Sequence, residues 1–322
     1  MANRKLKIAD CHCDTISLLA TNDYDFSQRN SRGHIDLPRL LEGEVKLQFF
    51  AVCVAPEKQR SYLQSALEHI ARYHRCLAAN REHMISLEKK EDLLAAQREG
   101  KIAALLALEG AEPLEGSTEL LDIFYRLGMR ALSLTWNHRN LFADGAGEES
   151  AGGGLTCAGK ALIRELSGKG IILDLAHLSN RCFFEALELT DQPPLVSHAN
   201  ARRLCDHPRN LDDEQLKALA NRGGVIGLSL YPYFITGEAK AGLEQLLDHF
   251  VHIAGLIGVE HLAFGSDFDG IPCTIEEIKD VSGYPSLPQA LCRRGFNHSE
   301  VEMIAWDNVN RILTNNIGDG KS

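Results

Sequence analysis

Short apolar runs alternate along the chain with longer segments in which apolar residues recur at helical spacing. The runs are apolar throughout, which is typical of strands buried on both faces of a parallel sheet. The eight predicted strands span about residues 6–12, 47–54, 102–108, 130–135, 171–176, 194–197, 224–230 and 262–266. The predicted helices span about residues 60–84, 89–98, 117–127, 157–168, 179–188, 212–221, 240–257 and 298–315.

Strands that alternate with helices indicate βαβ units and parallel pairing. Eight such units in 322 residues predict an α/β fold, a (β/α)8 TIM-type barrel. A doubly wound open sheet is the main alternative. No linker interrupts the pattern, so we expect residues 1–322 to form a single catalytic domain. The segment at about 136–156 is too long for an ordinary βα loop, and its composition suits either a lid or a disordered surface loop.

The chain is acidic, with a net charge of -10 at pH 7. This acidity argues against nucleic acid or an anionic membrane as a partner. No apolar run is long enough to span a bilayer, and no signal-peptide pattern precedes the first strand. The nine cysteines contain no CxxC pair and are expected to be reduced thiols. We therefore predict a cytoplasmic protein with neither a nucleic acid nor a membrane as its partner.

Residues that bind metals follow the ends of several predicted strands. His12 and Asp14 are two positions apart, so we expect their side chains to point to the same side of the first strand. In a barrel, residues at the carboxyl ends of the strands meet at one face. The other candidates at strand ends are Glu109, His177, His198 and Asp267.

Imidazole nitrogens and carboxylate oxygens are common zinc ligands, and two-metal sites are frequent in hydrolases. We expect Glu109 to bridge two zinc ions, with His12 and Asp14 on one ion and His177 and His198 on the other. Other divalent metals suit the same ligands. Taken singly, each residue has a structural alternative; Asp14, for example, is well placed to cap the following turn. The agreement of five strand ends favours a two-metal hydrolase.

At these residues the sequence resembles the membrane (renal) dipeptidase family of zinc peptidases, including its soluble bacterial members. The resemblance implies a metal-dependent barrel, two zinc ions and hydrolysis of small dipeptides, with tolerance of a D-residue at the C-terminal position. A homodimer is also implied by the family. The matching segments are residues 10–15, 108–110, 174–179, 196–199, 209–213 and 265–270.

The resemblance also implies roles for residues outside the metal ligands. Arg209 would bind the terminal carboxylate of the substrate, and Asp267 would transfer the proton. Tyr231 would be a further substrate contact. Without the resemblance, a surface ion pair of Arg209 with Asp212 or Asp213 is the simpler interpretation.

One position departs from the family pattern. Its animal members carry a histidine just after the fourth strand, and Trp136 stands there in this chain. Either His138 or Asn137 is a candidate to replace it as a substrate contact. The departure leaves open which group stabilises the oxyanion, and Trp136 is equally well explained as a packing residue at the barrel top.

The mechanism expected from these residues is attack on the peptide carbonyl by a hydroxide that bridges the two zinc ions. Asp267 would accept the proton and pass it to the leaving amine. One alternative is another amidohydrolase-type activity, such as an N-acyl amino acid deacylase or a lactonase. Many such enzymes bridge their metals with a modified lysine on the fourth strand, and residues 130–135 contain none. A non-catalytic metal-binding barrel is the other alternative.

Overall fold

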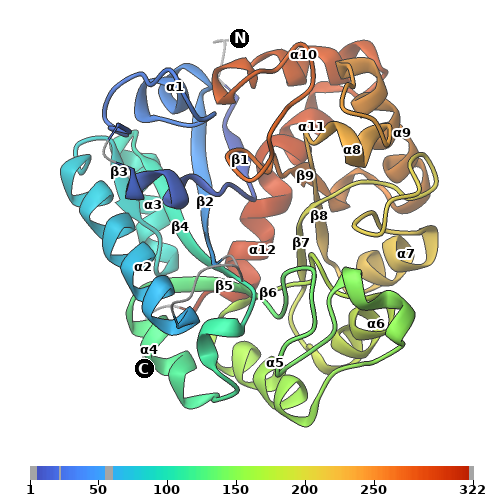
Figure 1. Ribbon diagram of the computed structural model, residues 1–322. Coiled ribbons are helices and arrows are strands. Elements are labelled where there is room, and N and C mark those ends of the chain that lie inside the picture. The colour runs from blue at the N-terminus through green and yellow to red at the C-terminus, as the bar shows by residue number, and fades with distance from the viewer. Residues whose placement is uncertain (1–5, 22, 55–60, 319–322) are drawn as a thin grey trace.

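The computed structural model describes residues 6–21, 23–54 and 61–318. Its centre is a ring of parallel strands with helices around the outside (Figure 1). The ring closes because β1 pairs with both β2 and β9, while β2 also pairs with β4. The barrel strands are β1 (Ile8–Asp10), β2 (Val45–Cys53), β4 (Ile102–Glu109), β5 (Met129–Ser133), β6 (Ile172–Asp174), β7 (Leu195–Ala199), β8 (Val225–Leu228) and β9 (Leu262–Phe264).

Each barrel strand coincides with a strand expected from the apolar runs, so the predicted TIM-type barrel is confirmed. The open-sheet alternative is wrong, because the pairing of β2 with β4 joins the two ends of the strand order and leaves no barrel strand at an edge. The amphipathic segments form α2 (Tyr62–Ala79), α3 (Lys90–Glu99), α4 (Glu119–Arg126), α5 (Cys157–Lys169), α6 (Asn180–Leu189), α7 (Asp213–Asn221) and α9 (Leu243–Ile257). Among the described residues, no helix has the length and apolar character needed to cross a membrane.

The predicted last helix is divided into three parts. It consists of α11 (His298–Glu302), a π-helical turn η6 (Met303–Asp307) and α12 (Asn308–Asn316). Asn297 caps the start of α11 by accepting a hydrogen bond from the backbone of Glu300, as its residue type favours.

Four short elements lie where the apolar pattern did not predict them. The strand β3 (Met84–Ser86) pairs with the first half of β4, and the helix expected over 60–84 therefore ends earlier. The unpredicted helices are α1 (Leu37–Glu42), α8 (Pro232–Ile235) and α10 (Ser286–Arg293). The elements β3, α1 and α8 have six residues or fewer and contain too few turns to show a period, whereas α10 was missed although α4, of the same length, was predicted.

The barrel interior is divided into an apolar floor and a polar mouth. Inward-facing residues such as Phe49, Leu105 and Ile172 form one buried cluster, which Trp306 and Ile312 of the C-terminal segment complete. A second, larger cluster packs between the strands and the outer helices. Because the floor is apolar and buried, charged groups at the opposite end of the barrel are exposed to solvent from one side only.

Candidate metal centre and substrate pocket

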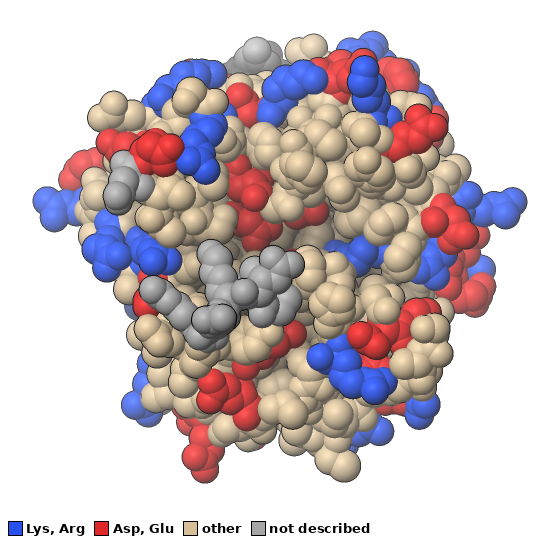
Figure 2. All heavy atoms as spheres, in the orientation of Figure 1, with Lys and Arg blue, Asp and Glu red and all other residues tan. Residues whose placement is uncertain are grey.

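The candidate site residues lie together at the carboxyl ends of the barrel strands. Figure 2 shows acidic side chains gathered in a hollow at the centre of this face. Glu109 ends β4, His198 lies in β7, and His177 and Asp267 follow β6 and β9. The remaining two, His12 and Asp14, follow β1. The sequence therefore predicted correctly which residues meet.

His12 and Asp14 lie beyond the end of β1, so strand alternation, from which their common direction was predicted, is not what brings them together. The strand β1 ends at Asp10, so simple alternation along a strand does not extend to either residue. The chain beyond it is held in place by hydrogen bonds to the neighbouring strand and loop. The backbone N–H of Cys13 donates to Phe49 at 3.1 Å, and that of Asp14 donates to Phe268 at 2.8 Å.

Glu109 lies between two groups of side chains. Its Oε1 atom is 2.6 Å from Nε2 of His177 and 3.7 Å from Nε2 of His198. Its Oε2 atom is 3.6 Å from Nε2 of His12, which in turn lies 3.4 Å from Oδ2 of Asp14. Within each group the potential ligand atoms all lie within 4.8 Å of one another. One carboxylate therefore faces two sets of metal-binding atoms.

The chemistry of these atoms fits divalent cations. Nε2 of His12 is buried and has no hydrogen-bond partner, although it points between two carboxylates. The Nε2 atoms of His177 and His198 lie only 2.9 Å apart, beside the same carboxylate oxygen. Burial lowers the pKa of His177 to about 4, so its imidazole is neutral and able to act as a ligand.

His177 is oriented from its other ring nitrogen. Nδ1 lies 2.8 Å from Oδ1 of Asn137, which we assign as an N–H donor to the amide oxygen. The backbone of His177 is in the left-handed region, with φ of 70°, and its carbonyl accepts a hydrogen bond from Ala146 at 2.7 Å. Both supporting groups come from segment 136–156. This segment therefore packs against the end of β6 and supports a candidate ligand.

Asp267 lies at the edge of the same group, in a turn with φ of 65°. Burial raises its pKa to about 8, with the carboxylates of Asp14 and Glu109 acting in the same direction. Gly270 closes this turn against the site. A Cβ atom at Gly270 would lie 2.1 Å from Oδ2 of Asp14 and 2.7 Å from Oδ1 of Asp267, so only glycine permits this approach.

Arg209 is a buried cation, with 6% of its surface exposed. Its Nη2 atom lies 2.7 Å from Nε2 of His198, and its Nε atom is buried without a partner. The alternative of a surface ion pair is wrong. Asp212 instead caps α7, and Asp213 pairs with His252. No carboxylate of the described residues lies within 4.0 Å of Arg209, which leaves its charge available to an anionic ligand.

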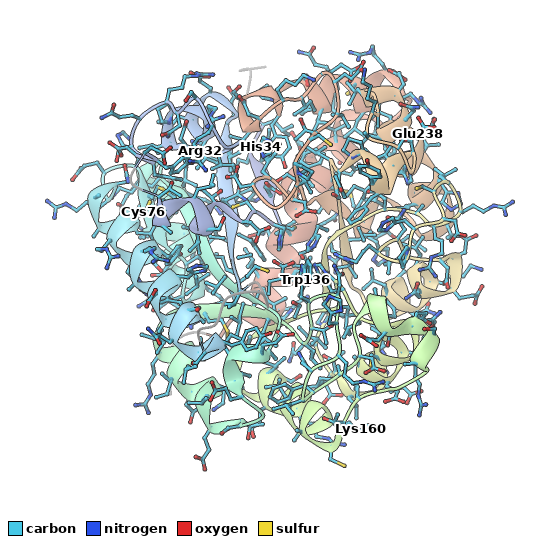
Figure 3. The ribbon with its side chains drawn as sticks, in the orientation of Figure 1. Arg32, His34, Cys76, Trp136, Lys160 and Glu238 are labelled. Atoms are coloured by element: carbon cyan, nitrogen blue, oxygen red, sulfur yellow. The ribbon has the colours of Figure 1, made fainter. Side chains whose placement is uncertain are left out.

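Except for His12, which lies behind them, these side chains line one cavity of about 490 Å³. Tyr231, Asn137 and Trp136 also line it, and Figure 3 places Trp136 near the centre of the barrel face. His138 is not among the lining residues; its side chain is 63% exposed and lies 3.8 Å from Glu148. The structure therefore brings Asn137 and Tyr231 to the site and places His138 outside it.

Several lining residues were not singled out from the sequence. Phe234 is packed against His207 and Tyr231, with ring centroids 4.7 Å and 5.0 Å apart, and forms an aromatic wall beside Arg209. Cys53 at the end of β2 and Asp269 also line the cavity. Cys53 follows the same strand-end rule as the metal candidates and was detectable on that basis.

The chain is similar to known proteins over most of its length. The family described as membrane dipeptidase (peptidase family M19) matches residues 2–318 of the chain. The dipeptidase tcpJ of Claviceps purpurea is 33% identical over 322 residues, which cover 94% of this chain and 76% of that protein. The dipeptidase aclJ of Aspergillus oryzae is 33% identical over 293 residues, which cover 87% of this chain and 69% of that protein.

Two solved structures match almost the whole chain. The dipeptidase AC, a metallopeptidase of family M19, has a TM-score of 0.90 at 28% identity and covers 97% of this chain and 99% of its own. A metallopeptidase from Rhodobacter sphaeroides has a TM-score of 0.90 at 26% identity with the same coverage. That enzyme was solved with a phosphinate mimic of the dipeptide L-Ala-D-Ala.

Proposed function

Because the chain belongs to the membrane dipeptidase family and is therefore a metal-dependent hydrolase of peptide bonds, we propose that it cleaves dipeptides at a centre that binds two zinc ions. The observation that carries this proposal is the position of Glu109. Each of its oxygens faces a separate set of candidate ligands, His12 with Asp14 on one side and His177 with His198 on the other. A single ion would leave one of these two sets of candidate ligands without a cation.

Two divalent cations would activate a water molecule for attack and would polarise the scissile carbonyl. The protein residues supply the proton transfer. Asp267 is buried beside both groups of candidate ligands, and its raised pKa suits a group that takes a proton from water and returns it to an amine. We propose that it acts first as the base and then as the acid.

Arg209 is proposed to bind the terminal carboxylate of the substrate. A buried guanidinium with no carboxylate partner gains most from a bidentate anion, and the carboxylate of a dipeptide provides one. The cavity of about 490 Å³ suits a substrate of this size. Tyr231 lines the wall beside Phe234 and is proposed as a further substrate contact.

The substrate is proposed to include dipeptides with a D-residue at the C-terminal position. The support is the Rhodobacter sphaeroides relative, which binds a mimic of L-Ala-D-Ala. Asn137, whose Oδ1 lies 2.8 Å from Nδ1 of His177 and which lines the cavity, is proposed to replace the histidine of the animal enzymes as a substrate contact. The exposed position of His138 does not support a direct role for it.

We also propose that residues 1–322 act as one catalytic domain, because the candidate ligands come from both ends of the chain. The homodimer and the cytoplasmic location stay predictions from the sequence.

The proposed function is tested by metal analysis and substrate screening on one preparation. Two zinc ions per chain, together with turnover of dipeptides that differ in stereochemistry, are the expected results. The same screen includes N-acyl amino acids and lactones. Turnover of these compounds without turnover of any dipeptide would contradict the proposal and favour the other amidohydrolase activities.

A further inference from the structure

A buried serine lies beneath the two groups of candidate ligands. Ser197 belongs to β7 and is 1% exposed. Its Oγ atom is 2.8 Å from Nδ1 of His198 and 3.5 Å from Nδ1 of His12. These histidines come from opposite sides of Glu109. One hydroxyl therefore contacts a candidate ligand of each cation.

The position of the ring protons follows from the metal geometry. Both histidines direct Nε2 toward Glu109, so Nε2 has to carry the lone pair if it is to bind a cation. A neutral imidazole then carries its hydrogen on Nδ1 and needs an acceptor there. The hydroxyl oxygen of Ser197 is in place to accept from His12 and His198.

A candidate acceptor for the O–H group of Ser197 lies nearby. The buried carboxylate of Asp174 accepts a hydrogen bond from the backbone N–H of Ser197 at 3.0 Å and also interacts with its side chain. A hydroxyl offers two lone pairs and one O–H. An O–H directed toward Asp174 leaves both lone pairs of the hydroxyl to accept from the two imidazoles, so this carboxylate is in place to orient the hydroxyl.

We propose that Asp174 and Ser197 form one positioning unit that fixes the ligand tautomer on both sides of the metal centre. This inference rests on the two-cation site proposed above. Neither Asp174 nor Ser197 lines the substrate cavity. The unit acts through His12 and His198, so its loss weakens the binding of both cations.

Asn137 provides the matched contrast. It contacts Nδ1 of His177 alone, and His177 belongs to one side of Glu109. Removing its amide oxygen should weaken one cation and leave the other. The two positioning contacts therefore differ in how many ions they support, which a general loss of stability would not reproduce.

The test is a zinc titration of the metal-free protein against a competing chelator, with the melting temperature of the metal-free protein as the second readout. Wild type is expected to bind two ions. Ser197→Ala should weaken both by about 10–100-fold, the usual effect of removing a group that orients a ligand. Asn137→Leu should weaken one ion, and the hydroxyl-retaining Ser197→Thr should recover most of the affinity. Ser229→Ala removes a serine that is also fully buried, next to β8, and should leave both affinities unchanged.

The inference is overturned if Ser197→Ala folds and binds both ions as wild type does, or if it weakens only one. Should Ser197→Ala fail to fold, Asp174→Asn decides the question, because it removes the acceptor of the hydroxyl proton and should weaken both ions. An Asp174→Asn variant with two unchanged affinities would then overturn it. A wild-type protein that binds fewer than two ions would contradict the proposed function itself, which separates the two failures.

Discussion

The two sides of Glu109 differ in charge. On one side, His12 stands between Glu109 and Asp14; burial by itself would lower the pKa of His12, but these carboxylates raise it well above its usual value. On the other side, burial and the nearby Arg209 hold the pKa of both His177 and His198 below the usual value.

This difference in charge indicates that the two sides of Glu109 have different roles. The side with two carboxylates is the better electrostatic site for a cation. The side with two neutral imidazoles has one shared carboxylate and lies next to Arg209, the proposed substrate anchor. We therefore expect the first side to hold its cation more tightly and the second side to be where the anionic end of the substrate is bound nearby.

The largest expected effect comes from removing the group that the two sides share. Glu109→Gln should release both cations and lower kcat/KM by more than the roughly 10²–10⁴-fold that one proton-transfer group contributes. Metal content and dipeptide turnover measure both effects. Glu112→Gln is the matched control, because this carboxylate contacts Asn140 rather than a histidine, and the variant should keep two ions. A Glu109→Gln protein with full metal content would contradict the comparison.

The next effect separates proton transfer from metal binding. Asp267→Asn should keep both cations and lower kcat by roughly 10²–10⁴-fold, the usual contribution of one proton-transfer group. Steady-state kinetics and metal analysis on the same sample decide between the roles. Unchanged kcat would exclude Asp267 as the base, and loss of one ion would make it a ligand instead.

The third effect concerns the close approach of Gly270 to the carboxylates of Asp14 and Asp267. Gly270→Ala should displace both carboxylates, since its Cβ would lie 2.1 Å from Asp14 and 2.7 Å from Asp267. We expect kcat to fall by at least about 10-fold, with weaker binding of the cation on the Asp14 side. Gly255→Ala in α9, where a Cβ meets nothing within 4 Å, is the control. It should raise the unfolding free energy by up to about 1 kcal/mol and leave kcat unchanged.

The smallest expected effect concerns the proposed contact between Arg209 and the terminal carboxylate of the substrate. Arg209→Lys should raise KM for dipeptides by about 10-fold, because an ammonium group replaces a bidentate contact with a single point charge. Dipeptide amides, which lack the carboxylate, should be hydrolysed poorly by both proteins with little difference between them. Equal KM values for dipeptides in wild type and variant would refute the proposed anchor.

The sequence was sufficient to predict the barrel and the residues that meet at its mouth. Continuous apolar runs mark strands buried on both faces, and a closed barrel brings the residues at their ends to one place. Glu109 and His198 could therefore be identified as candidate ligands from their positions in the sequence alone. The short elements β3 and α8 were not, because three or four residues contain no measurable period.

The supporting contacts could not be predicted in the same way. Asn137 and His177 are 40 residues apart, and their contact depends on how segment 136–156 folds back over β6. The requirement for glycine at position 270 arises from a close approach in space that no local pattern records. Position in the sequence was thus enough to identify the residues proposed to perform the chemistry. The residues that hold them in place could be identified only from the folded structure.

The central claim is that one carboxylate is shared by two cations, and diffraction at the zinc absorption edge tests it most directly. Crystals of the zinc-loaded protein are expected to show two anomalous peaks per chain, one on each side of Glu109, with each about 2.0–2.2 Å from a carboxylate oxygen. A single peak, or two peaks of which one makes no contact with Glu109, would contradict the account.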